Sequence, residues 1–226
     1  MRLVSLELCS GTESFTSVMR SVYPHHTHVT VDIDPTCQPT YACDLLDFDY
    51  QKLIPPSDNL VTHIWCSPPC TQYSNMRTTG PPRDLVSADM IVNKCLSIVR
   101  YYLARNPDLM WFMENPRTGL LKTRPCVCHL PFYDVTYCRY APEWGMRKST
   151  RIWTNRRGFV PKVCLGRECP AVSVDTNTGR YRHTQTVCGK FWKRGVWLSK
   201  KHKQKEMGRV PPRLILELLQ SVTCHA

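Results

Sequence analysis

The sequence lacks the segments that mark membrane and secreted proteins. No apolar run approaches the roughly 20 residues that a membrane-spanning helix needs. The N-terminus, MRLVSLELCSG, has no basic start followed by a long apolar core, so no signal peptide is expected. Internal repeats and low-complexity tracts are also missing. We therefore expect an intracellular protein, in a prokaryotic cytoplasm or a eukaryotic nucleus, that makes no contact with membranes.

Cysteine, by contrast, is abundant for a chain without a secretory signal. The 13 cysteines are an odd number, which argues against a disulfide framework and favours thiols that bind metal or take part in catalysis. The 226 residues include 42% apolar and 10% aromatic residues, as in globular proteins. This length suits one full domain with a small appendage.

Acidic residues are scarce in one segment only. Residues 156–213 hold 15 Lys and Arg against 3 Asp and Glu, whereas residues 1–155 hold 15 against 14. A basic excess confined to one segment is typical of phosphate contact, although a solvated face is the alternative for charge alone. Aromatic side chains that could stack on bases lie among these charges and favour nucleic acid over a free nucleotide. They are Tyr181, Phe191, Trp192 and Trp197.

Apolar runs that end in polar residues alternate with helical patterns in the first 155 residues. The spacing of apolar residues predicts helices from near Phe15 and between Leu85 and Arg105. Strands are predicted at 3–8, 28–34, 60–65, 109–116, 133–140 and 150–155. This alternation predicts a doubly wound α/β sheet, which binds ligands at the carboxyl ends of its strands.

The predicted organisation has three parts. Residues 1–155 form the sheet domain, and residues 156–206 form a small basic insert without long periodic elements. Residues 207–226 contain a helix, introduced by prolines, that returns to the first domain. We expect the chain to be a monomer.

The stretch HIWCSPPCTQYSN, residues 63–75, places Cys70 directly after two prolines. Proline fixes the backbone and removes a hydrogen-bond donor, so this turn is expected to be stiff and exposed. A structural cysteine is usually buried as a small apolar filler. A cysteine held on a rigid turn therefore favours a nucleophile.

Taken in order, the motifs resemble those of the cytosine-5 DNA methyltransferases, from about residue 3 to the C-terminus. LELCSGTESF resembles the turn that surrounds the methionine part of S-adenosylmethionine. VDID resembles the motif whose acid binds the ribose hydroxyls, and CDLL resembles the Asp-hydrophobic pair that contacts the adenine. SPPCTQYS resembles the Pro-Cys nucleophile loop and MENP the Glu-Asn motif. CRYAPEWGMRKSTRIWTN and GRVPPRLILELL resemble the arginine-bearing and closing motifs. The compact form resembles members encoded by phages and other viruses.

The resemblance implies a Rossmann-like fold, S-adenosylmethionine as cofactor and DNA as substrate. An acid at the end of a second strand also suits vicinal hydroxyls, which favours Asp32. Asp34 and Asp44 are weaker candidates, because loop aspartates often only form turns. The cofactor-binding residues that the resemblance implies are Leu8, Cys9, Gly11, Thr12, Phe15, Asp32, Ile33, Asp44, Leu45 and Pro68.

Methylation of carbon 5 of cytosine requires covalent catalysis. A thiolate that adds to carbon 6 breaks the aromaticity of the ring and makes carbon 5 nucleophilic, a role for Cys70. A protonated Glu114 could hydrogen-bond ring nitrogen 3 and stabilise the resulting charge. Arg151 and Arg147 could hold the pyrimidine oxygen, or contact a surface phosphate or carboxylate instead. A stacked base cannot reach such a pocket, which implies base flipping or a single-stranded substrate.

The insert contains two close pairs of metal-binding residue types, in CLGRECP and HTQTVCGK. Two such pairs suit one tetrahedral zinc ion, which would hold together a segment too small to form its own core. Separate unliganded thiols are the alternative, and CVCH at 126–129 could also bind metal. The predicted zinc ligands are Cys164, Cys169, His183 and Cys188.

Family members carry their target-recognition region between the arginine motif and the closing motif, and here it is far shorter than usual. The predicted DNA contacts are Ser74, Arg180, Arg182, Lys190 and Arg194. The recognised DNA sequence does not follow from these residues.

Departures from the family pattern leave other functions open. Gly11 is the one glycine of the first motif, RKSTR replaces the usual Gln-x-Arg-x-Arg, and Arg209 stands where Asn is typical. One alternative is an exocyclic-amino methyltransferase, whose signature is Ser/Asp-Pro-Pro-aromatic. The other is a catalytically inactive, zinc-bearing protein that binds nucleic acid.

Overall fold

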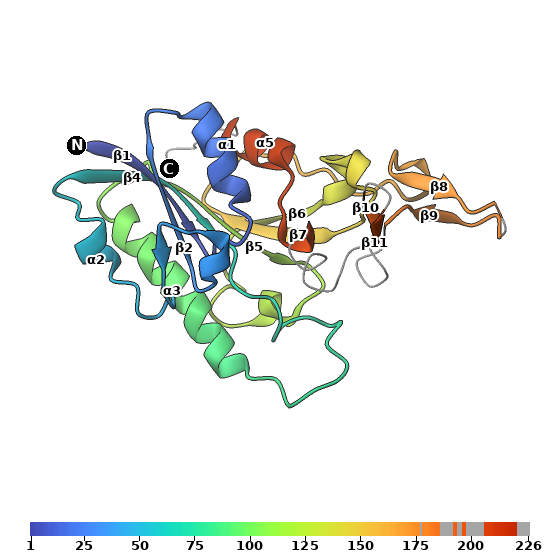
Figure 1. Cartoon of the computed structure of the whole chain (residues 1–226), viewed down its shortest axis with the longest axis horizontal. Coiled ribbons are helices and arrows are strands. Elements are labelled where there is room, and N and C mark those ends of the chain that lie inside the picture. The colour runs from blue at the N-terminus through green and yellow to red at the C-terminus, as the bar shows by residue number, and fades with distance from the viewer. Residues whose placement is uncertain (177, 186–191, 194–195, 198–205, 221–226) are drawn as a thin grey trace.

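The computed structural model describes the chain except residues 177, 186–191, 194–195, 198–205 and 221–226. A seven-stranded sheet in the order β3-β2-β1-β4-β5-β7-β6 forms its centre (Figure 1). The strands are β1 (Arg2–Leu8), β2 (Thr27–Asp32), β3 (Tyr41–Ala42), β4 (Asn59–Cys66), β5 (Met110–Pro116), β6 (Phe132–Thr136) and β7 (Ser149–Thr154). The helices are α1 (Ser14–Val22), α2 (Tyr50–Leu53), α3 (Leu85–Leu103) and α5 (Pro212–Gln220).

The connections wind outward from β1 in both directions, which confirms the predicted doubly wound sheet. β1 is parallel to β2 and to β4, β2 is parallel to β3, and β4 is parallel to β5. β7 runs antiparallel to both of its neighbours, β5 and β6. The carboxyl ends of β1, β2, β4 and β5 therefore lie along one edge of the sheet, where a doubly wound fold binds its ligands.

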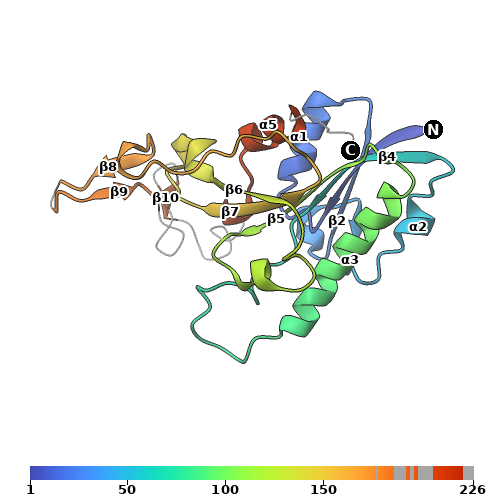
Figure 2. The same cartoon turned by 180° about the vertical axis from the view of Figure 1, so that it is seen from behind.

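Helices cover both faces of the sheet. Figures 1 and 2 show α1 and α5 side by side on one face and α3 on the other. Along β1, Leu6 and Leu8 belong to the core under α3, while Phe15 of α1 and Leu214 of α5 belong to the opposite core. These layers follow from side chains that alternate between faces along each strand. Among the described residues, no helix is both long and apolar enough to cross a membrane.

One predicted strand is shorter than expected. The strand predicted at 133–140 ends at Thr136, because Tyr137–Arg139 form a 3-10 turn. This turn redirects the chain, so that the Tyr137 amide donates to the Lys148 carbonyl at 2.9 Å. The turn thereby brings residues 137 and 148 to the end of the sheet beside β5.

The insert contains small antiparallel hairpins. β8 (Val172–Val174) pairs with β9 (Tyr181–His183), and β10 (Trp192–Lys193) pairs with β11 (Val196–Trp197). Figure 1 shows the β8–β9 hairpin projecting beyond the β6–β7 end of the sheet. In the described part of the insert, a small buried cluster contains Cys169 and Ala171 together with Cys138, which follows β6.

Candidate active site

The loop that carries Cys70 is fixed to the two strands on either side of β4. The Ser67 amide donates to the Leu8 carbonyl at 3.0 Å, and Asn115 Nδ2 donates to the Pro68 carbonyl at 2.9 Å. The Tyr73 amide closes a turn by donating to the Cys70 carbonyl at 3.0 Å. Cys70 is half-buried rather than exposed as the sequence predicts.

Side chains beyond the turn keep the loop in place. The fully buried Tyr73 donates its hydroxyl proton to Asp89 of α3 at 2.7 Å. Arg83 donates to the carbonyl oxygens of Gln72 and Ser74 at 2.6 and 2.9 Å. These contacts hold Ser74, a predicted DNA contact at the end of the nucleophile loop, in a half-buried position. Side-chain and backbone hydrogen bonds therefore hold the loop in addition to the two prolines.

Glu114 of β5 is buried, with 6% of its surface exposed, and has two charged or polar neighbours. Tyr137 donates a hydrogen bond to Glu114 Oε1 at 3.1 Å, and Lys148 Nζ lies 3.3 Å from the same oxygen. Lys148 also donates to the Met207 carbonyl at 2.9 Å. Neither neighbour is among the residues that the sequence predicts, although Lys148 lies inside the RKSTR segment of the arginine-like motif.

The Cys70 thiol, Glu114 and Lys148 influence one another electrostatically. Burial raises the pKa of the Cys70 thiol, and the negative charge of Glu114 raises that pKa further. The ammonium of Lys148 acts in the opposite direction and favours the thiolate. The predicted nucleophile and the predicted acid are therefore close enough to interact, and Lys148 lies close enough to act on both.

The two predicted arginines do not join this group. In the β5–β7 register Glu114 is opposite Ile152, whereas Arg151 is opposite Asn115 and therefore points to the other face of the sheet. There Arg151 donates to both carboxylate oxygens of Asp134, at 2.7 and 2.8 Å. Arg147 is exposed. Lys148 is thus the basic side chain that the structure brings to Glu114.

The turn after β1 is strained. Cys9, Gly11 and Glu13 have positive φ angles of 54°, 46° and 51°, a region that non-glycine residues rarely adopt. Asp32, at the end of β2, stabilises this conformation by accepting from the Gly11 amide at 2.7 Å, while its other carboxylate oxygen accepts from the Asp34 amide at 2.9 Å. Strain of this kind at a strand end is typical of ligand sites.

The predicted cofactor residues divide into buried and accessible groups. Ile33 is 69% exposed beside the half-buried Asp32, so a ligand at the end of β2 could reach both. Asp44 is half-buried and accepts from the Leu46 amide at 2.9 Å. Cys9, Gly11 and Thr12 are also half-buried, whereas Leu8, Phe15, Leu45 and Pro68 are buried.

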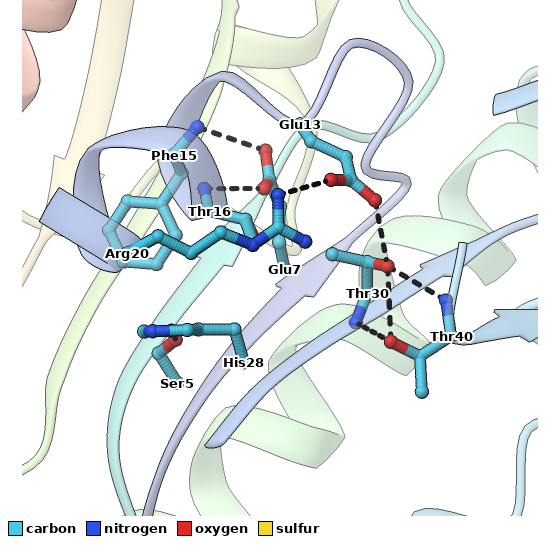
Figure 3. Close-up of polar contacts among 9 residues, drawn as sticks. All are labelled: Ser5, Glu7, Glu13, Phe15, Thr16, Arg20, His28, Thr30 and Thr40. Carbon is cyan, nitrogen blue, oxygen red and sulfur yellow. Dashed lines mark hydrogen bonds and ion pairs between the residues drawn. The ribbon is translucent and has the colours of Figure 1, made fainter. Parts of the chain in front are cut away.

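A buried glutamate stabilises the start of α1, directly after this turn. Glu7 of β1, 2% exposed, accepts hydrogen bonds from the amides of Phe15 and Thr16 at 3.2 and 2.8 Å (Figure 3). These amides begin α1 and lack partners within the helix. Burial is the main cause that raises the pKa of Glu7 to about 7. No sequence motif predicts this role, although Glu7 occupies a polar position between apolar neighbours in LVSLEL.

A Glu7→Gln variant is expected to change how stability depends on pH. The folded protein retains the Glu7 proton up to about pH 7, whereas the unfolded chain releases it near pH 4.5. The free energy of unfolding of the natural protein therefore falls between these values, by about 2 kcal/mol from pH 5 to pH 8. Gln has no proton to release, so Glu7→Gln should lack this part of the decrease.

Urea unfolding of both proteins at pH 5 and pH 8 measures the difference. Glu143→Gln, which removes an exposed glutamate, is the matched control. An identical pH dependence in Glu7→Gln and the natural protein would contradict the expectation.

Four metal-binding side chains meet where the insert joins the sheet. The ligand atoms of these residues all lie within 4.8 Å of one another. Three of the four predicted zinc ligands belong to this group, while Cys188 lies outside the described residues. In the part of the chain that the structure covers, the CVCH residues do not form such a group. The members are Cys138, Cys164, Cys169 and His183.

The predicted DNA contacts of the insert are only partly described. Arg180 and Arg182 are exposed at the β8–β9 hairpin. The guanidinium of Arg167 lies over the ring of Tyr181, 5.3 Å from its centroid, on the same hairpin. Lys190 and Arg194 lie outside the described residues.

Comparison with known proteins identifies a relative along almost the whole chain. No family model matches the sequence. The chain is 33% identical to a "Probable DNA (cytosine-5)-methyltransferase" of Frog virus 3 (isolate Goorha), over 95% of this chain and 97% of that protein. Among solved structures, a methyltransferase of Entamoeba histolytica has a TM-score of 0.44 at 14% identity. That alignment spans 68% of this chain and 52% of the Entamoeba chain.

Proposed function

The chain belongs to the DNA (cytosine-5)-methyltransferase family, and from this premise we propose that it transfers a methyl group from S-adenosylmethionine to carbon 5 of cytosine in DNA. One observation carries the proposal. Cys70 follows β4, Glu114 lies near the carboxyl end of the adjacent β5, and the Glu114 charge acts on the Cys70 thiol. A nucleophile and an acid at neighbouring strand ends are the two groups that this reaction needs from the protein.

In the proposed reaction the Cys70 thiolate adds to carbon 6 of the cytosine. Carbon 5 then becomes an enamine carbon that can accept the methyl group. Water would accept the proton from carbon 5, and the electron pair of the broken C–H bond expels the Cys70 thiolate from carbon 6, which restores the aromatic ring. Because burial and Glu114 both disfavour the thiolate in the free protein, Lys148 is proposed to favour its formation.

Glu114 is proposed to hydrogen-bond ring nitrogen 3 and so to stabilise charge during the attack. Tyr137 would hold the carboxyl in place through its 3.1 Å hydrogen bond. Lys148 lies 3.3 Å from Glu114. We propose that it holds the pyrimidine oxygen, the role predicted from the sequence for Arg151 and Arg147. Arg151 donates to Asp134 on the other face of the sheet, so we favour Lys148 over Arg151 as the residue that contacts the base.

S-Adenosylmethionine would supply an activated methyl group. The residues at the carboxyl ends of β1 and β2 fit this cofactor, because Asp32 is a half-buried acid beside an exposed apolar side chain, Ile33. Asp32 is proposed to bind the ribose hydroxyls and the turn at 9–13 to surround the methionine part. The strained backbone of that turn supports this assignment.

A cytosine must leave its stack to reach the half-buried Cys70, so the proposed substrate is a flipped base or single-stranded DNA. The exposed Arg180 and Arg182 are proposed to contact its phosphates. Such a substrate would place the reaction inside the cell. One copy of the chain carries every group named here, so a monomer is proposed.

Product analysis tests this function. Purified protein is incubated with isotope-labelled S-adenosylmethionine and DNA or RNA, and the nucleosides are separated after digestion. The expected product is 5-methylcytosine from DNA. Label in N4-methylcytosine would instead support amino methylation, and label in RNA alone would exclude the DNA substrate. Salt-sensitive DNA binding without transfer of labelled methyl groups would support the alternative of a catalytically inactive protein that binds nucleic acid.

A further inference from the structure

Three separate chain segments meet at the junction of the insert and the sheet. Cys138 lies in the 3-10 turn after β6, Cys164 and Cys169 flank a second 3-10 turn, and His183 ends β9. The ligand atoms of all four residues lie within 4.8 Å of one another. Cys138 and Cys169 are buried, and the other two are half-buried.

We propose that Cys138, Cys164, Cys169 and His183 bind one structural zinc ion that fastens the insert to the sheet domain. Three thiolates and one imidazole form a common closed, tetrahedral zinc site. In such a site Zn–S bonds of about 2.3 Å and Zn–N bonds of about 2.05 Å separate sulfur from nitrogen by about 3.6 Å. The distance from Cys164 Sγ to His183 Nε2 is 3.6 Å.

The local backbone explains how these ligands come together. The Cys169 amide donates to the Gly166 carbonyl at 3.2 Å, which bends the segment between the two cysteines into a tight turn. The Val172 amide then donates to the Cys169 carbonyl at 2.9 Å. Val172 pairs with His183 across the β8–β9 hairpin. The hairpin thus sets the imidazole beside the two thiols.

A metal would stabilise a segment that has little core of its own. In the described part of the insert and its junction, the buried cluster comprises only Cys138, Cys169 and Ala171. The strands of the β8–β9 hairpin have three residues each. So small a unit ordinarily needs a metal or disulfides to keep one conformation.

The position of Cys138 gives the ion a second role, which rests on the proposed function. The neighbouring residue, Tyr137, donates to Glu114, and its amide donates to Lys148. On the insert side, the Gln185 amide donates to the Gly145 carbonyl at 2.9 Å. Zinc bound to Cys138 would therefore act as a positioning element for the acid of the active site.

Metal analysis of the full chain tests the ligand set. The purified natural protein should contain about one zinc per chain by mass spectrometry of the metals. Cys138→Ser should lose most of it, whereas Cys188→Ser and Cys128→Ser should retain it, because four other ligands already complete a tetrahedral shell. Zinc retained in Cys138→Ser, zinc lost in Cys188→Ser, or a natural protein that holds iron or no metal would each overturn the proposal.

Cobalt replacement distinguishes a lost ligand from a misfolded variant. Cobalt added to the chelator-treated natural protein should give thiolate-to-cobalt charge transfer and the visible bands of a tetrahedral ion. Cys138→His, which offers a ligand that zinc also accepts, should recover these visible bands with weaker charge transfer. An octahedral spectrum from the natural protein would overturn the site. Neither measurement depends on methyl transfer, so its outcome is separate from that of the proposed function.

Discussion

A Cys70→Ser variant is expected to lose methyl transfer to cytosine by roughly 10⁴-fold or more, the scale on which removal of a catalytic nucleophile acts. The serine hydroxyl has nearly the same shape as the thiol, but it does not ionise near neutral pH and cannot add readily to carbon 6. The loop should stay intact, because its hydrogen bonds involve the backbone and the Tyr73 and Arg83 side chains rather than the thiol. Single-turnover transfer of labelled methyl groups to DNA measures the loss.

A covalent trap gives an independent measurement of the same role. DNA that contains 5-fluorocytosine, incubated with S-adenosylmethionine, should form a stable adduct with the natural protein, because after methyl transfer the fluorine cannot leave carbon 5 as the proton does. Cys70→Ser should form none, and Cys128→Ser, which removes an exposed thiol, should form it normally. Undiminished transfer by Cys70→Ser would show that the Cys70 thiol does not attack the ring and would favour amino methylation.

The sheet and most strand ends follow from the sequence, because both depend on local patterns. In β1 the apolar residues Leu6 and Leu8 face one core and Glu7 faces the other, as the alternation in LVSLEL predicts. The same reasoning finds Cys70 and Glu114, because each follows or ends an apolar run. Parallel strands then bring these ends to one edge without further information.

The neighbours of Glu114 could not be predicted in this way. Tyr137 and Lys148 reach Glu114 only because the strand predicted to 140 stops at Thr136 and the chain turns back. Arg151 was predicted from its motif, yet the β5–β7 register decides which face it occupies. A shift of one residue in that register would reverse the outcome.

The metal cluster shows the same limit of local reasoning. Spacing in the sequence finds pairs such as Cys164 and Cys169, because both lie within one short turn. Cys138 lies in the sheet domain and joins them only through the packing of the insert on that domain. No local pattern marks it as a ligand.

A Glu114→Gln variant is expected to slow methyl transfer by about 10²- to 10⁴-fold, the usual contribution of a positioned acid. Gln keeps the size of the side chain and can still accept the Tyr137 hydrogen bond. It cannot donate a carboxyl proton to ring nitrogen 3 or become negatively charged. The rate of a single turnover with saturating S-adenosylmethionine and DNA measures this loss.

The same substitution should make Cys70 more reactive toward a simple alkylating reagent. Glu114 raises the pKa of the Cys70 thiol, so its removal lowers that pKa and increases the thiolate fraction at a fixed pH below it. Lys148→Met, the matched change of opposite sign, should raise the pKa and slow alkylation. Iodoacetamide labelling of Cys70 across pH, followed by peptide mass spectrometry, measures both.

In Glu114→Gln the rate of methyl transfer should fall while the rate of Cys70 alkylation rises, and this combination identifies the role of Glu114. If Glu114 acted only through the acidity of Cys70, the variant would alkylate faster and also methylate faster. Slower methylation together with faster alkylation requires that the carboxyl acts on the pyrimidine ring itself. Slower alkylation would mean that the Cys70 loop is disturbed, and unchanged rates in both assays would remove Glu114 from the site.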